Sequence, residues 1–192
     1  MHTTPAADGN ARLANLLGAL ALEAVSRQED AISDVTAQGG AAAGAIVTMA
    51  KYPDRTIEQL REPLGLSQPG AARLVDRLVR KGWVDRSGPG GRRGLRLRLT
   101  ADGEAVFDRL LLARRAALEE VLAPLSEDER AALGGLLERM LGARSSTHAD
   151  TERLCRECER RCCARCPVAL GAARAKAAGA TGPSGSPRAR PR

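Results

Sequence analysis

The strongest constraint on the fold comes from residues 67–99, where a helical repeat of apolar residues gives way to a strand repeat. The apolar residues of the first part recur at i, i+3, i+4, i+7 and i+8, and they are Ala71, Leu74, Val75, Leu78 and Val79. This spacing puts them on one face of a helix, which has to be buried against another element. Leucine and arginine then alternate over 95–99, which is typical of a strand with one buried and one solvent-facing side.

Capping and turn residues divide this region into two helices and a hairpin. Thr56 and Gln59 have the spacing of a capping box, so a short helix is expected to begin there. A Gly-containing turn follows, and Ser67 then caps the second helix while Pro69 fits its first turn. Residues 83–100 are expected to form a β-hairpin, because two alternating runs are joined by a Gly- and Pro-rich loop.

Further helices are expected on both sides of this region. Apolar periodicity and capping residues predict them over 12–35, 41–50, 101–122 and 126–144. Aromatic residues make up only 2% of the chain, so that Leu, Val and Ala have to fill the core, and Leu and Ala favour helices. The predicted fold class is mainly α with a small β-wing, that is, a winged helix-turn-helix plus long N- and C-terminal helices.

Positive charge is concentrated in the same region. Between Arg73 and Arg98 there are nine cations and two acids, whereas residues 101–140 hold nine acids and five cations. A polyanion would meet one basic zone, as in nucleic-acid-binding proteins. Gln and Arg on the polar face of helix 67–81 can pair with adenine and guanine in a major groove, and Arg at the hairpin tip suits phosphate contact. The candidate DNA-binding residues are Ser67, Gln68, Pro69, Gly70, Arg73, Arg77, Arg92 and Arg93.

A resemblance to the MarR family of winged-helix transcriptional regulators is carried by two runs of residues. They are Leu-Gly-Leu-Ser-Gln-Pro-Gly-Ala-Ala-Arg-Leu-Val-Asp-Arg-Leu-Val-Arg-Lys-Gly-Trp-Val-Asp-Arg from position 64 and Gly-Arg-Arg-Gly-Leu-Arg-Leu-Arg-Leu-Thr-Ala-Asp-Gly from position 91. The likeness covers about residues 12–145. It implies a recognition helix at 67–81 and a wing tip at Arg93. It departs from the family at Gly91, where the Asp of the family's Asp-x-Arg wing signature would stand.

The same resemblance implies partners. It implies a homodimer in which the N- and C-terminal helices form the dimer interface, and a double-stranded operator DNA as ligand. The family often binds small anionic effectors, but the scarcity of aromatic residues gives no support for an aromatic-lined pocket, and the effector stays unassigned. The predicted function is a sequence-specific transcriptional regulator, and the alternative is a winged-helix protein-interaction module with a structural zinc site.

All five cysteines lie within twelve residues, at Cys155, Cys158, Cys162, Cys163 and Cys166. In a cytosolic protein such a cluster favours a metal or redox site over a disulfide framework. Two C-x-x-C pairs, separated by four residues, could hold zinc, and the alternative spacing C-x2-C-x3-C-x3-C-P favours an iron–sulfur cluster. A thiol redox switch and an apolar stripe that extends the last helix remain further alternatives.

The expected organisation has four parts: a leader at 1–10, the winged-helix and dimerisation domain at 11–145, the cysteine segment at 146–170 and a disordered basic tail at 171–192. No apolar run reaches the roughly 20 residues that span a bilayer, and the N-terminus does not have the charge pattern of a signal peptide, so a cytoplasmic protein is expected. No catalytic triad, phosphate loop or cofactor fingerprint is found, so an enzyme is not expected.

Overall fold

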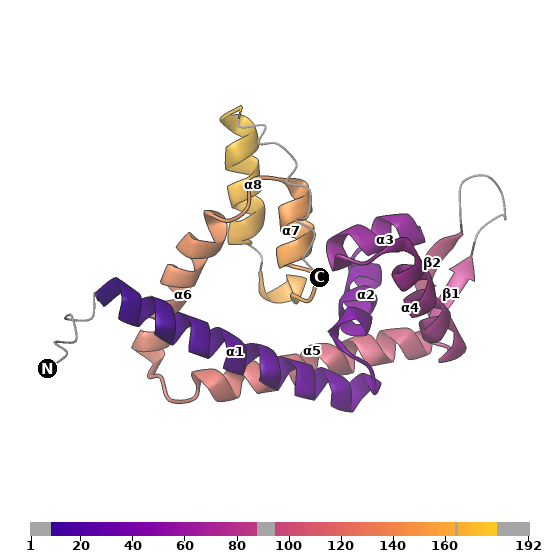
Figure 1. Cartoon of the computed structure of the whole chain (residues 1–192), viewed down its shortest axis with the longest axis horizontal. Helices are drawn as coiled ribbons and strands as arrows, with labels where there is room; N and C mark the ends of the chain where they lie inside the picture. The colour runs from indigo at the N-terminus through magenta and orange to yellow at the C-terminus, as the bar shows by residue number, and fades with distance from the viewer. Residues whose placement is uncertain (1–8, 88–94, 164, 180–192) are drawn as a thin grey trace, which may run out of the picture. The chain divides into compact units, whose positions relative to one another are not determined.

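The structure is a computed structural model, and it describes residues 9–87, 95–163 and 165–179. The chain separates into two compact units, Met1–Ser126 and Glu127–Arg192. Figure 1 shows the helices that make up most of both units and the single two-stranded sheet of the described chain. The predicted fold class, mainly α with a small β-wing, is therefore confirmed. No helix among the described residues is long and apolar enough to cross a membrane.

The first unit consists of two long helices and a compact winged-helix lobe. Its elements are α1 (Gly9–Thr36), α2 (Gly40–Lys51), α3 (Ile57–Leu64), α4 (Gln68–Arg80), β1 (Val84–Ser87), β2 (Arg96–Leu99) and α5 (Ala101–Leu122). Helices α1 and α5 lie against each other (Figure 1), while α2, α3, α4 and the sheet gather near the start of α5. Because α1 already begins at Gly9, it includes the last two residues of the expected leader at 1–10.

Helix α2 forms the centre of the lobe. Every residue from 42 to 49 is buried, including Ile46 and Met49, and the Ala and Gly residues among them allow neighbouring helices to approach closely. Around α2 the core contains Leu60 from α3, Leu78 from α4 and Leu97 from β2. The helix-turn-helix and the sheet are thus held by one shared apolar core.

The sheet is an antiparallel pair in which Val84 lies opposite Leu99 and Asp85 lies opposite Arg98. As the alternation predicted, Leu97 is buried and its neighbours Arg96 and Arg98 are exposed. Leu95 is also exposed, because β2 begins one residue later, at Arg96. Arg55 forms an isolated antiparallel bridge with Leu97, so the segment before α3 also contacts the sheet.

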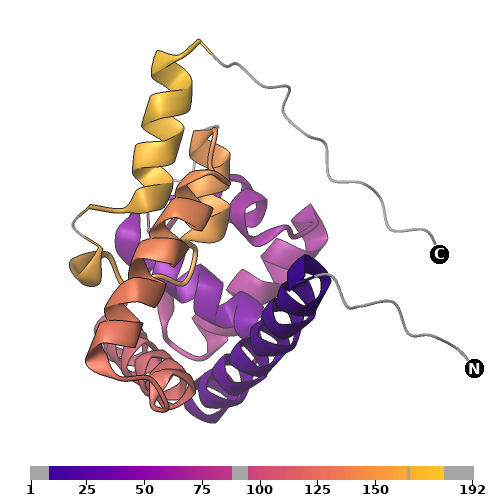
Figure 2. The ribbon, with the colours of Figure 1, turned by 90° about the vertical axis from the view of Figure 1, so that its left-hand side faces the viewer.

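The second unit contains α6 (Glu127–Gly142), α7 (His148–Leu154), the 3-10 turn η1 (Arg160–Cys162) and α8 (Pro167–Ala177). Helix α8 packs against both α6 and α7, as Figure 2 shows from the side. The α6–α8 contact is close, because a Cβ atom on Gly171 would lie 2.2 Å from the carbonyl oxygen of Gly142. The structure therefore groups α6 with the cysteine segment and divides the chain after residue 126 rather than 145.

One expectation and one open alternative for the C-terminal segment need correction. The tail predicted to be disordered at 171–192 is helical over its first part, since α8 runs from Pro167 to Ala177. Pro at the start and Ala-rich sequence after it favour this helix, and positions 180–192 lie outside the described residues. The cysteines also do not extend a helix as an apolar stripe, because α7 ends at Leu154 and a turn and η1 follow.

Candidate nucleic-acid interface

The first helix of the helix-turn-helix is fixed by local contacts that the sequence predicted. The Thr56 hydroxyl accepts a hydrogen bond from the Gln59 N–H at 3.3 Å, and the Thr56 N–H donates to the Gln59 side chain at 3.1 Å. This capping box starts α3. The helix ends at Gly65, whose φ of 64° is accessible to glycine at little cost, and the chain then turns into α4.

Helix α4 is oriented by its buried stripe. Ala71, Leu74, Val75 and Leu78 are at most 1% exposed and face the shared core. The polar side chains on the other face, Gln68, Arg73 and Arg77, are exposed. Since a stripe buried this completely prevents rotation of the helix, the exposed face is presented in one fixed direction. The predicted division of α4 into a core face and a polar face is therefore confirmed.

The first turn of α4 explains two further candidate residues. The Ser67 hydroxyl accepts a hydrogen bond from the Gly70 N–H at 3.3 Å and caps the helix. A Cβ atom at position 70 would lie 3.1 Å from this hydroxyl oxygen, so Gly70 leaves room for the cap. Pro69 occupies the first turn, where it replaces an N–H that no helical carbonyl would accept. These three residues therefore set the start of α4.

The two exposed arginines of α4 differ in their contacts. The Arg77 Nε donates to the Gln38 side-chain oxygen at 3.2 Å, and Gln38 lies two positions after the end of α1. Close by, the Lys81 ammonium donates to the Thr36 carbonyl at 3.1 Å and lies 4.5 Å from the centre of the Trp83 ring. Arg73 has no side-chain partner among the described residues. The C-terminal half of α4 is thus tied to the end of α1, which no sequence pattern predicted.

The base of the wing is held by two ion pairs. Arg86 on β1 pairs with Asp76 on α4, and Arg98 on β2 makes a two-bond contact with the Asp54 carboxylate at 2.5 and 2.7 Å. The hydrogen bonds from Arg98 hold the pKa of Asp54 below its usual value, and Arg96 also donates to the Asp54 carbonyl oxygen at 2.9 Å. Asp54 has a φ of 66°, a conformation that Asp tolerates better than most residues.

The candidate residues at the wing tip, Arg92 and Arg93, lie outside the described residues, as does Gly91. Of the remaining candidates, the structure brings Ser67, Gln68, Pro69, Gly70, Arg73 and Arg77 together on α4. Sequence reasoning missed Gln38 and Asp54 as neighbours of this surface. Each contacts an arginine more than 35 positions away in the chain, and the turn sequence around Pro53 indicated only where the helix before it ends.

The candidate metal residues form a separate group in the second unit. All five cysteines are thiols, and the Sγ atoms of Cys155 and Cys166 are 3.9 Å apart. Cys155, Cys158 and Cys166 are half-buried, whereas Cys162 and Cys163 are exposed. Within the described part of the chain, no three Cys, His, Asp or Glu side chains are arranged as a metal site.

Comparisons with known proteins agree with this geometry. Residues 33–94 match the model of the MarR family. The multiple antibiotic resistance protein MarR of Escherichia coli is 34% identical over 85 residues, which cover 43% of this chain and 59% of that protein. The chain thus spans about three fifths of the length of the curated relatives that it matches.

Solved structures show the same architecture. Wild-type MarR of Escherichia coli in its apo form matches with a TM-score of 0.57 and 25% identity, over 67% of this chain and 96% of that one. A mutant MarR from Escherichia coli, complexed with operator DNA, matches with a TM-score of 0.52 and 25% identity, over 68% of this chain and 94% of that one.

The fold and the exposed face of α4 define a winged-helix protein, since two capped helices are followed by an antiparallel hairpin on one core. Within that class, the chain is similar to the MarR family, as the match over residues 33–94 and the likeness to the MarR structure show. The resemblance expected from the sequence is thereby confirmed.

Proposed function

We propose that this protein is a sequence-specific DNA-binding transcriptional regulator that acts as a homodimer. The observation that carries the proposal is the exposed Gln68–Arg73–Arg77 face of α4, which the buried opposite stripe holds in one direction. A helix of this kind fits a major groove, where Arg pairs with guanine and Gln with adenine. The structural match to a MarR protein complexed with operator DNA supports the same mode of binding.

Apolar side chains on α1 support a homodimer. Leu13, Leu16, Leu17 and Leu20 recur at helical spacing on one side of α1, and each is at least 47% exposed. A soluble protein rarely leaves such a row in water, and it marks an interaction surface. Helix α6 carries a second exposed row, Leu136, Leu137, Met140 and Leu141. A second copy of the chain would cover these rows, and the two α4 helices would then meet half-sites about one helical turn of DNA apart.

The test measures binding of the full-length protein to duplexes from its own upstream region, by fluorescence anisotropy at several salt concentrations. We expect Arg73→Ala to weaken specific binding by about 1–3 kcal/mol and to relax the sequence preference at one position in each half-site. Arg109→Ala on α5 is the matched control, because it removes an exposed arginine outside the basic zone. It should change the affinity only slightly.

Three outcomes would overturn the proposal or a part of it. If Arg73→Ala and Arg77→Ala leave both affinity and sequence preference unchanged, α4 is not the reading helix. If duplex DNA binds no better than another polyanion of equal charge, the basic face serves an acidic partner, and the chain is a protein-interaction module. Sedimentation of the purified protein as a monomer at the concentrations used would refute the dimer.

A further inference from the structure

The five cysteines gather where α7 ends and α8 begins. Cys155 is the cap that ends α7, and Cys166 is the residue before the first turn of α8. Between them, the Cys158 N–H donates to the Cys155 carbonyl at 3.1 Å, which closes a tight turn. We propose that Cys155, Cys158, Cys166 and one thiol of the adjacent pair Cys162 and Cys163 bind a divalent d10 cation, Zn²⁺ above all, as a tetrahedral thiolate site.

The first support is a distance. Two sulfur ligands at about 2.3 Å from a tetrahedral zinc ion are about 3.8 Å apart. The Sγ atoms of Cys155 and Cys166 are 3.9 Å apart, although the two residues are eleven positions apart in the chain. This pair therefore already has the spacing of one edge of a zinc tetrahedron, and both sulfur atoms belong to residues that a helix end fixes.

The second support is the crowding of thiols around Cys155. The Cys155 thiol interacts with the side chains of both Cys158 and Cys166, and its Sγ atom is 3.9 Å from that of Cys166. Three of the proposed ligands are therefore already neighbours. A bound dication would hold such neighbouring thiolates together, because each of them would face two positive charges. Ligation has to draw Cys158 and the fourth thiol inward, and the exposure of Cys162 and Cys163 leaves them room to turn.

The third support is the charge of the segment. A zinc ion with four thiolates carries a net charge of about −2, which is costly unless nearby cations offset it. Residues 153–166 contain five arginines and two glutamates. The local excess of positive charge matches what a thiolate site needs.

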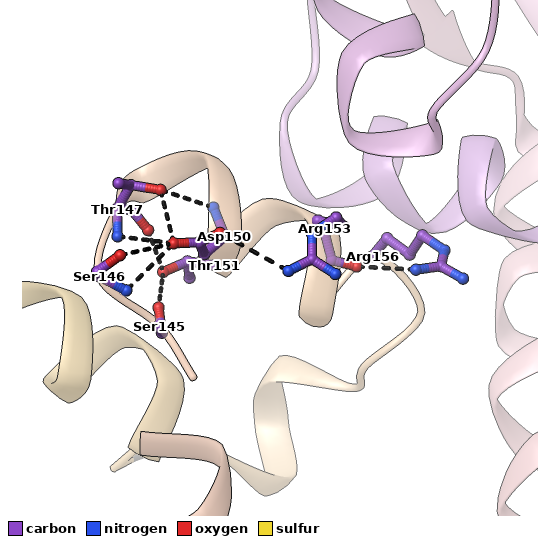
Figure 3. Close-up of polar contacts among 7 residues, drawn as sticks. All are labelled: Ser145, Ser146, Thr147, Asp150, Thr151, Arg153 and Arg156. Carbon is purple, nitrogen blue, oxygen red and sulfur yellow. Dashed lines mark hydrogen bonds and ion pairs between the residues drawn. The ribbon is translucent and has the colours of Figure 1, made fainter. Parts of the chain in front are cut away.

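The fourth support is the way the start of α7 is anchored (Figure 3). The Asp150 carboxylate accepts hydrogen bonds from the N–H and hydroxyl groups of Ser146 and Thr147, at 2.9–3.2 Å. The Thr147 hydroxyl in turn accepts from the Asp150 N–H and completes a capping box. This network fixes the start of α7, a helix of only seven residues, and thereby places Cys155 at its end.

The last support is the small core of the second unit. Among its described residues, Val168 and Ser145 are the buried ones. A unit of this size with so little buried apolar surface needs another source of stability, such as a metal, a disulfide or a partner. A second copy of the chain would cover the apolar row of α6, but the junction of α7, η1 and α8 would still depend on its cysteines.

The test uses the full chain, purified under reducing conditions, stripped of metal and titrated with Co²⁺ and then Zn²⁺. We expect one Co²⁺ per chain with thiolate charge-transfer bands and the intense visible bands of tetrahedral cobalt, displaced by Zn²⁺. Zinc should also lower the number of reactive thiols from five to one in the native protein. Both measurements are made without DNA, so the result is independent of the proposed regulatory function.

Variants define the ligands. Cys155→Ser and Cys166→Ser should each remove the four-sulfur cobalt spectrum and weaken zinc binding by at least roughly 10–100-fold, the loss that even outer-shell changes cause. Of Cys162→Ser and Cys163→Ser, one should change the spectrum and the other should not. His148→Ala is the matched control: its imidazole is a nearby nitrogen donor but lies exposed beside Glu152, and its loss should leave the spectrum unchanged.

Four results would overturn the proposal. The first is reduced protein that binds no Co²⁺ or Zn²⁺ while circular dichroism shows that it is folded. The second is a Cys162→Ser/Cys163→Ser double variant with an unaltered cobalt spectrum, since only three cysteines would then remain. The third is an iron chromophore with acid-labile sulfide in the isolated protein, which would make the site an iron–sulfur cluster. The fourth is a disulfide between Cys155 and Cys166 in the isolated protein, together with no metal uptake after this disulfide is reduced. The segment would then be a thiol switch and not a metal site.

Discussion

Replacement of Gly103 by Ala tests how the long helix α5 is joined to the wing. Gly103 lies in the first turn of α5, and a Cβ atom there would be 2.0 Å from the Trp83 carbonyl oxygen. Because real Cβ atoms essentially never approach another atom within 3.0 Å, the backbone at one of the two positions has to move by about 1 Å. The same carbonyl accepts the Thr100 N–H at 3.1 Å, so the displacement also strains a hydrogen bond.

The expected magnitude follows from opposing effects. Ala in place of Gly within a helix stabilises by about 0.5–1 kcal/mol when nothing interferes. At Gly103 this gain is outweighed by overpacking, which costs about 1–3 kcal/mol, and by the weakened hydrogen bond, which costs about 0.5–1.5 kcal/mol. We therefore expect Gly103→Ala to lower the free energy of unfolding by about 1–3 kcal/mol, measured by urea denaturation followed by circular dichroism.

Gly18→Ala is the matched control, because Gly18 lies inside α1 and a Cβ atom there would have no neighbour within 4 Å. It should leave the stability unchanged or raise it by up to about 1 kcal/mol. A Gly103→Ala protein as stable as the Gly18→Ala protein would refute the close approach of α5 to the wing. Gly103→Ala should also weaken DNA binding at temperatures where the variant is folded. Trp83 directly precedes β1, so a displacement of Trp83 would also displace the wing.

Three further outcomes are expected. Leu74→Ala should destabilise the protein by about 2–5 kcal/mol in urea denaturation, because Leu74 is 1% exposed in the core beneath α4. Asp150→Asn should lower the free energy of unfolding at neutral pH and make this free energy fall less steeply as the pH is lowered into the acid range. Hydrogen bonds from Thr147 hold the pKa of Asp150 below its ordinary value of 3.8. The carboxylate therefore stabilises the folded protein above pH 3.8, and this stabilisation is lost as the pH falls through the folded pKa. Gln38→Ala should alter DNA affinity less than Arg77→Ala, compared by fluorescence anisotropy, because it frees Arg77 without removing its charge.

The parts of the fold that sequence predicted are those set by neighbouring residues. The capping box at Thr56, the cap at Ser67 and the stripe on α4 all depend on spacings of three or four residues, and each was found where expected. The alternation of Leu and Arg likewise placed β2 and its buried Leu97. Such signals are local, so a single sequence contains everything needed to read them.

The contacts that sequence could not predict join distant parts of the chain. Nothing near Gln38 marks it as a partner of Arg77, and nothing near Gly103 shows that Trp83 lies against it. The same limit applies to the cysteine segment, where the helical spacing of the thiols was compatible with one continuous helix. The break after Leu154 arises because the α7 cap at Cys155 leads into a turn rather than another helical turn.

The contacts around α4 also bear on how the two arginines of the candidate interface differ. Arg73 has no described partner and can contact a base at no cost to the fold, whereas Arg77 has to share its guanidinium with Gln38. Gln38 and Thr36 lie at the end of α1, the helix that carries the apolar row, and Thr36 also accepts a hydrogen bond from Lys81. The direction of α4 is therefore set from two sides, by the core beneath its stripe and by the end of α1. Under the proposed function, loss of Arg73 would remove a contact to DNA alone, whereas loss of Arg77 would also remove a link between the end of α1 and α4.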